Sequence, residues 1–218
     1  MNGIYSNPFF IFFGVAALFL AMVWFFKWKR AKDLGELAAS IGLQFSPEGP
    51  ELNTLENSGL EIFRQGHSRK AANLIQVQSR WGALNIFDYR FTTRGGRNSS
   101  THTFTLALMG CPRCSVPVFE LKPETLIYKI GEAIGFKDID LPAFPLFSDK
   151  YRLTGPDEAA VHMFFTPQRA AWFERNLGLR VQGAPGYLVL FKREGQLPVN
   201  SWPDFIEEVK GFAAEVLG

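Results

Sequence analysis

The first 26 residues of the chain contain no charged side chain, and this run constrains the fold more than any other feature. Residues 9–26 form an unbroken apolar stretch, which as a helix extends about 27 Å, close to the thickness of a bilayer's hydrocarbon core. Tyr5 at one end and Trp24 and Trp28 at the other suit the two membrane interfaces. The sequence therefore predicts a transmembrane anchor in residues 1–32.

The basic residues next to this stretch predict its orientation. They all follow it, as Lys27, Lys29, Arg30 and Lys32, and none precedes it. A cleavable signal peptide has the opposite order, with positive charge before the apolar run. Because cytoplasmic flanks are enriched in Lys and Arg, we expect a single-pass protein of a bacterial inner membrane, with its N-terminus outside and its body in the cytoplasm.

The remaining residues, 33–218, are expected to form one folded cytoplasmic domain. With 22 Phe, 5 Trp and 5 Tyr, the chain is too apolar to remain disordered, and two cysteines cannot staple a secreted domain of this size. Residues 1–32 hold four of the 23 basic residues and none of the 21 acidic ones, so the domain is close to neutral. That balance disfavours a nucleic-acid partner.

The order of periodic segments predicts an α+β fold, in which an antiparallel meander of about five strands is followed by several packed helices. A helix over residues 31–42 continues the span or bends just after it. The meander strands are expected at residues 60–65, 72–81, 84–93, 101–109 and 116–121. Beyond the meander, we expect helices at residues 124–134, 157–163, 167–176 and 202–217, a strand at 151–153, and a hairpin made by 179–182 and 187–193.

Cys111 and Cys114 form the motif that looks most like chemistry. A Cys-x-x-Cys pair is typical of thiol-redox sites and of half of a zinc site. Here a strand rather than a helix is expected after the motif, and the chain has no third cysteine. The spacing therefore favours a structural turn, with a redox pair and a metal site as the alternatives, and we predict neither a metal nor a cofactor.

Two further constellations lie on the expected hairpin around residue 97. Arg94 and Arg97 flank two glycines in a segment that predicts a hairpin tip, with contact to an anion or a lipid headgroup as the alternative. Asp88 and His102 lie on paired strands and suggest a catalytic dyad. With Thr93 opposite Thr101, however, they are about 13 Å apart along the strand, so acid–base catalysis is disfavoured.

Several segments resemble uncharacterised bacterial membrane-anchored proteins that have a single span. They are residues 85–103 (NIFDYRFTTRGGRNSSTHT), 119–124 (FELKPE), 151–158 (YRLTGPDE) and 165–167 (FTP), which together span most of residues 85–168. The resemblance implies one N-terminal span and a soluble α+β domain. It implies no activity and no catalytic residues.

Three functions remain open on the sequence alone. The first is a non-enzymatic accessory or scaffold subunit that docks on a larger membrane protein complex. It is favoured because a folded domain attached to a span lacks any recognised catalytic motif. The second is a thiol-redox or other enzyme that uses Cys111 and Cys114. The third is a module that binds the surface of anionic lipid through the basic segment 61–100, which carries seven Lys and Arg residues against two acids.

Overall fold

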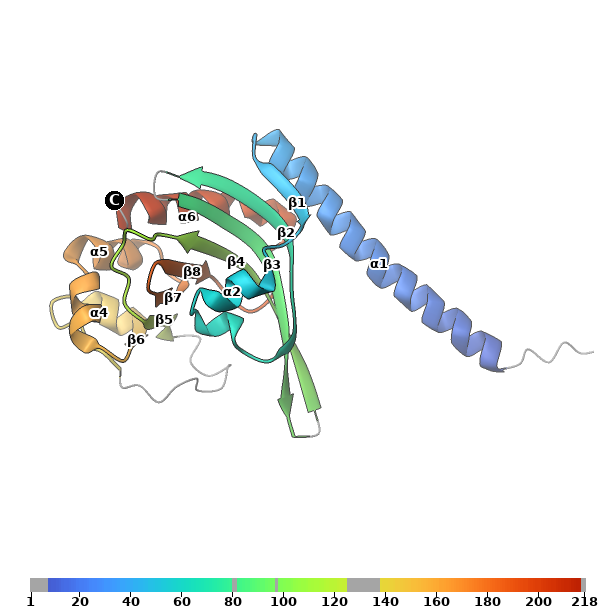
Figure 1. Cartoon of the computed structure of the whole chain (residues 1–218), viewed down its shortest axis with the longest axis horizontal. Coiled ribbons are helices and arrows are strands. Elements are labelled where there is room, and N and C mark those ends of the chain that lie inside the picture. The colour runs from blue at the N-terminus through green and yellow to red at the C-terminus, as the bar shows by residue number, and fades with distance from the viewer. Residues whose placement is uncertain (1–7, 80–81, 97, 125–137, 217–218) are drawn as a thin grey trace, which may run out of the picture.

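The computed structural model describes residues 8–79, 82–96, 98–124 and 138–216, and it has an eight-stranded antiparallel sheet with helices on both faces (Figure 1). The strand order is β1-β2-β3-β4-β8-β7-β5-β6. The strands are β1 (Gln44–Glu48), β2 (His67–Ser79), β3 (Gly82–Gly95), β4 (Asn98–Gly110), β5 (Phe119–Pro123), β6 (Tyr151–Thr154), β7 (Arg180–Ala184) and β8 (Tyr187–Phe191). The expected α+β class is confirmed.

The longest element is the helix α1 (Pro8–Ser40), which leaves the body as a single rod (Figure 1). Its most apolar 18-residue stretch has a mean hydropathy of 2.0, and none of that stretch is buried in the body. In length and composition this helix suffices to cross a membrane. Its last turns pack onto the sheet, so the predicted juxtamembrane helix is the continuation of the span and not a separate element.

Alternation along β3 divides the core between the two faces of the sheet. Leu84 and Ile86 point to one face, into a large cluster shared with α1 and α6 (Trp202–Val216). Phe87, Tyr89 and Phe91 point to the other face, into a second cluster. That second cluster is covered by the short helices α2 (Leu52–Asn57) and η1 (Glu61–Phe63). Because successive side chains in a strand face opposite ways, a strand buried on both faces reads as nearly continuous apolar sequence.

The remaining helices are α3 (Pro145–Lys150), α4 (Glu158–Phe164), α5 (Pro167–Arg175) and η3 (Val199–Ser201). Of these, α4 and α5 follow their predicted start signals, whereas the sequence pattern does not predict α3 or η3. The side chain of Asp157 accepts a hydrogen bond from the backbone N–H of Ala160, which caps α4. Thr166 caps α5 in the same way, and Pro167 occupies the first turn. The terminal helix α6 and the β7–β8 hairpin are also where the sequence predicts them.

The predicted meander is wrong in two respects. Residues 60–65 are not a strand, because they contain the 3-10 turn η1, whose Ile62 and Phe63 are buried under the sheet. The fifth predicted strand, which begins at Phe119 as β5, does not pair with β4, because the β7–β8 hairpin lies between them. The local pattern identifies a strand but not its neighbour, which tertiary packing chooses. The predicted helix at 124–134 lies almost wholly outside the described residues.

The junction between the span and the sheet as a candidate functional site

A buried carboxylate marks the place where α1 meets the sheet. Asp88, in the middle of β3, is only 3% exposed. Its two oxygens accept hydrogen bonds from Arg30 Nε at 2.7 Å and Arg30 Nη2 at 2.8 Å. They also accept from Asn73 Nδ2 at 2.8 Å and from the Thr105 hydroxyl at 2.9 Å. The carboxylate is therefore surrounded by donors from α1, β2 and β4.

The surroundings of this pair exclude water from most of it. Only 17% of the Arg30 side chain is exposed, and its guanidinium lies 5.9 Å from the ring centre of the fully buried Trp202. One and two turns further along α1, Leu34 and Ala38 are completely buried. A buried charge is tolerated when it is paired and its remaining lone pairs are satisfied, and both conditions hold here. The junction therefore fixes the direction in which α1 leaves the body.

The structure separates the four basic residues that the sequence groups as a membrane flank. Lys29 pairs with Asp33 at 2.8 Å and Lys32 with Glu36 at 3.7 Å, both on the exposed side of α1, and Lys27 is exposed. Arg30 instead faces the sheet. Its spacing of four and eight residues from Leu34 and Ala38 is the signal that could have identified it, because such residues share one helix face.

Asp88 and His102 do not form a dyad. The strands pair with Phe91 opposite His102 and Thr92 opposite Thr101, which is one residue away from the expected register. Asp88 and His102 therefore lie on opposite faces of the β3–β4 ribbon. A one-residue change in register moves every side chain of a strand to the other face.

His102 has other partners. Its Nδ1 lies 2.7 Å from a carboxylate oxygen of Glu194, and its Nε2 lies 2.9 Å from the hydroxyl of Thr93. The imidazole stacks on Phe91 with 5.1 Å between ring centres. None of the three surface hollows described below is lined by any of these residues. These contacts connect the loop after β8 to the hairpin. The sequence does not identify Glu194 as a partner of His102, because the two residues are 92 positions apart.

Cys111 and Cys114 form a disulfide within a tight turn that follows β4. The turn is also held by backbone bonds, from Cys114 N–H to the Cys111 carbonyl at 2.9 Å and from Cys111 N–H to the Gly186 carbonyl at 2.7 Å. Cys111 is buried, and Cys114 is partly exposed. No group of three His, Cys, Asp or Glu side chains able to hold a metal is found among residues 8–79, 82–96, 98–124 and 138–216.

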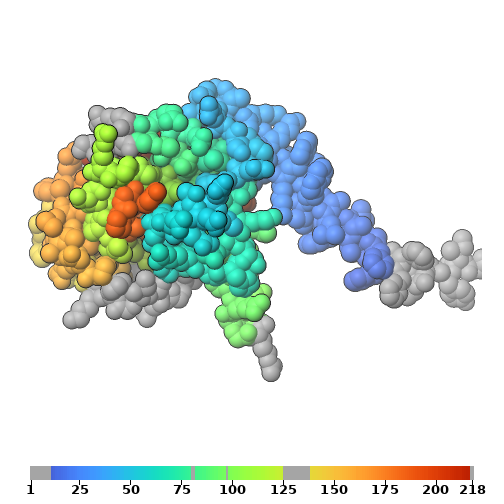
Figure 2. Space-filling view, in the orientation of Figure 1, coloured from blue at the N-terminus to red at the C-terminus, as the bar shows by residue number. Residues whose placement is uncertain are grey.

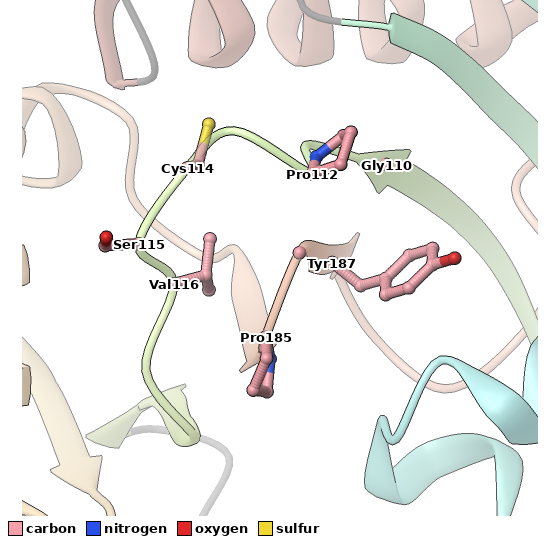
Figure 3. Close-up of a pocket in the computed structure, with 8 residues that line it drawn as sticks. Gly110, Pro112, Cys114, Ser115, Val116, Pro185 and Tyr187 are labelled. Carbon is pink, nitrogen blue, oxygen red and sulfur yellow. The ribbon is translucent and has the colours of Figure 1, made fainter.

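Two open hollows flank this turn. One, of about 450 Å³, is bordered by Cys114, Ser115 and Val116 on one side and by the Pro185–Tyr187 turn on the other. Figure 3 shows the Tyr187 ring extending away from Val116 and Cys114. The other, of about 660 Å³, reaches Met163 and Arg169. Neither hollow is lined by a carboxylate or a histidine, so neither presents an acid–base pair.

A second, partly buried carboxylate, Glu120, lies on β5, the last strand but one of the sheet. Glu120 accepts hydrogen bonds from Arg180 at 2.8 Å and Gln182 at 3.0 Å and pairs with Lys122 at 2.8 Å. Burial alone raises the pKa of Glu120, but these cations and the amide outweigh it and hold the pKa below the usual 4.5. Gln182 also accepts the backbone N–H of Ile62 at 2.9 Å, so the cluster connects β5 and β7 to η1. It borders a hollow of about 260 Å³ that Glu61 and Arg64 also line.

Of the two predicted anion-binding arginines, Arg94 lies near the end of β3 in the β3–β4 hairpin. Arg94 is exposed and pairs across the ribbon with Ser99. Arg97 lies outside the described residues. The structure does not bring His102, Cys111 and Cys114 into one site with Arg94.

Comparison with known proteins yields a likeness of fold. No protein-family model and no curated protein matches the chain. Among solved structures, the chain is similar to the crystal structure of the mycobacterial trehalose monomycolate transport factor A, TtfA. The TM-score is 0.53, the sequence identity is 13%, and the alignment covers 84% of this chain and 91% of that one.

Proposed function

We infer that this protein is a membrane-anchored, non-enzymatic accessory or scaffold subunit whose body is held in a fixed orientation to the bilayer and docks on a larger membrane protein complex. The observation that carries the proposal is the Arg30–Asp88 junction, which joins an apolar 33-residue helix to the sheet without a flexible linker. A tether that only kept the domain near the membrane would need no such junction. A domain that presents one particular face to a membrane partner needs a junction that fixes its orientation.

Three further observations support the proposal. The buried Asp88 and the partly buried Glu120 both have their carboxylate oxygens hydrogen-bonded by side chains of the same chain, which is typical of structural clusters. The structurally similar protein is a transport factor, and a factor that assists transport is compatible with an accessory role. Lys27, Lys29 and Lys32 remain on the exposed side of α1, and they favour a cytoplasmic body and an N-terminus outside.

Photo-crosslinking in intact membranes tests this function. A photoreactive amino acid is placed either on the span, at Phe19, or on the body, at the exposed Met163. We expect a discrete crosslinked membrane protein from the span position and the same protein from the body position. Asp88→Ala, which uncouples the body from α1, should weaken the body crosslink and keep the span crosslink. A chain that crosslinks to nothing at either position and runs as a lone monomer in several mild detergents would contradict the proposal.

Orientation is tested separately by labelling intact cells with an impermeant reagent. A cytoplasmic body is protected until the cells are opened. Labelling of the body from outside would overturn the proposed topology and leave the docking experiment unaffected.

The thiol-redox alternative has one observation in its favour, which is the partly exposed Cys114 beside an open hollow. The turn is followed by the strand β5 and lacks the helix N-terminus that lowers the pKa of a redox-active thiol. The scaffold role therefore has the stronger structural support.

A further inference from the structure

The β3–β4 hairpin projects from the body as an unsupported ribbon. β2 pairs with β3 only as far as Thr92, and β8 pairs with β4 only from Ala107 to Gly110. Beyond Thr92 the ribbon consists of β3 and β4 alone, closing with Gly95 opposite Asn98. Figure 2 shows the hairpin and α1 as two separate projections from the body. In Figure 1 the hairpin extends toward the side to which the N-terminal half of α1 also runs.

The ribbon is long enough to reach the level at which the span begins. Both projections leave from the Arg30–Asp88 junction. From Asp88 to Gly95 the strand extends about 23 Å, at about 3.3 Å per residue. From Arg30 back to Phe26, the last residue of the apolar run, the helix extends only about 6 Å. If the ribbon is inclined to α1, only part of its length projects along the helix axis. Half of its length still exceeds the distance from Arg30 to Phe26, so the ribbon still reaches the headgroup layer.

One face of the ribbon is basic, and it is the face turned toward α1. Asp88 faces Arg30, so Arg90 and Arg94, two and six residues further along β3, lie on the same face. Lys70 pairs with Arg90 across the sheet and so shares that face. Lys70, Arg90 and Arg94 are all exposed, and none has a carboxylate partner within the part of the chain that the structure describes.

The other residues of this face have hydroxyl groups. Thr101 and Thr103 stand opposite Thr92 and Arg90, and Ser99 stands opposite Arg94. On α1, Lys27 is three residues before Arg30 and extends the positive charge toward the span. Guanidinium groups with neighbouring hydroxyl donors suit phosphate oxygens, which accept several hydrogen bonds at once.

We propose that this face of the hairpin, formed by Lys70, Arg90 and Arg94, binds the phosphate headgroups of anionic phospholipids in the leaflet from which α1 emerges. The proposal rests on α1 spanning the membrane, as the proposed function does. The hairpin and the span would then hold the body at two separated points, which fixes its tilt as well as its distance from the bilayer. Each cation near an anionic surface strengthens binding roughly fivefold, so the three together contribute about a hundredfold.

The test places a fluorescent amino acid at Asn98, beside the hairpin tip, in the full-length chain reconstituted into vesicles. The vesicles contain either phosphatidylcholine alone or phosphatidylcholine with about 30% phosphatidylglycerol, together with a lipid that has a nitroxide quencher on its headgroup. Because both leaflets have the same composition, the orientation of the inserted chains does not affect the result. Flotation of the vesicles in 0.5 M salt reports separately whether α1 has inserted.

We expect stronger quenching in the anionic vesicles than in the zwitterionic ones, and loss of the difference in 0.5 M salt, where the screening length falls to about 4 Å. The triple variant Lys70→Gln/Arg90→Gln/Arg94→Gln should reduce quenching in anionic vesicles to the zwitterionic level. The charge-matched control Arg113→Gln/Lys150→Gln/Arg193→Gln, made at exposed positions elsewhere on the body, should keep the difference. An unchanged melting temperature shows that both variants are folded.

Two results overturn the proposal. Equal quenching in the two kinds of vesicle would show membrane contact without recognition of anionic headgroups. No quenching in either, with flotation intact, would place the hairpin away from the bilayer. Failure of flotation would refute the anchor itself, and with it the proposed function, so the two failures are distinguishable.

Discussion

Arg30 and Asp88, 58 positions apart in the sequence, form a bidentate ion pair that joins the apolar helix to the sheet. Arg30 Nε lies 2.7 Å and Nη2 lies 2.8 Å from the two carboxylate oxygens of Asp88. Arg30 belongs to a segment whose composition is that of a membrane flank, and Asp88 belongs to a strand inside the core. Their contact attaches the apolar helix rigidly to the body.

Removal of Asp88 should strongly destabilise the body. Asp88→Ala leaves the Arg30 guanidinium in a largely buried site without its counter-charge, which typically costs about 3–5 kcal/mol. The matched control is Asp33→Ala, which removes an exposed ion-pair partner of Lys29 on the same helix and should cost at most about 0.5 kcal/mol. Unfolding of the full-length chain in detergent measures both. Equal, small losses would show that the junction does not hold the fold.

The packing of α1 on the sheet makes a separate prediction. Leu34→Ala opens a cavity at a completely buried position and should lower the unfolding free energy by about 2–5 kcal/mol. Leu20→Ala, at a position that is 67% exposed on the span, should leave the melting temperature of the body unchanged. The comparison distinguishes loss of core packing from loss of a leucine on the same helix. A body that melts alike in both variants would show that α1 is not part of the core.

Acid should weaken the fold through Glu120. Because the folded-state pKa of Glu120 lies below its usual 4.5, ionised Glu120 stabilises the protein at pH values above about 4.5. That contribution is lost as the pH falls through the folded-state pKa. Denaturant unfolding at pH 7 and at several acidic pH values measures the loss. Glu120→Gln should be less stable at pH 7 and should lose less stability in acid, and a parallel acid dependence of the two proteins would contradict the prediction.

The disulfide turn should tolerate loss of both sulfur atoms. The backbone bonds around Cys111 and Cys114 remain when the side chains are changed. Closing so short a loop contributes about 2 kcal/mol in the chain-entropy description. The double variant Cys111→Ser/Cys114→Ser should therefore melt at a lower temperature but stay folded. The wild-type protein in a reducing agent should melt close to the variant, and unfolding of either one under native conditions would show that the turn depends on the covalent bond.

Local signals predicted much of the fold. The helix starts at Asp157 and Thr166, the hairpin around Pro185–Gly186 and the long ribbon around Arg94 all follow from capping and turn chemistry, which acts within a few residues. The register of the ribbon could not be predicted from the same signals. The register depends on which residue the chain turns at, and the sequence pattern on either side of the turn is compatible with a shift of one residue. The shift places His102 on the opposite face of the ribbon from Asp88.

The candidate site was less predictable than the fold. Arg30, Asn73, Asp88 and Thr105 come from four separate elements, and none of them has a neighbour in the sequence that identifies its partner. The same holds for Glu120 with Arg180 and for His102 with Glu194. Single polar residues in apolar strands are visible in the sequence, but the partner of a buried charge is chosen by the way the strands and helices pack.

The sequence by itself determined that the chain has a long uncharged apolar stretch, a basic segment after it and an α+β body, because hydrophobic periodicity and charge act along the chain. Only the tertiary structure decided that Arg30, one of these basic residues, faces the sheet and pairs with Asp88. It also decided that the β3–β4 hairpin and α1 project from the same junction. A buried carboxylate must find a cation wherever the fold places one, and that place depends on packing between elements far apart in the sequence.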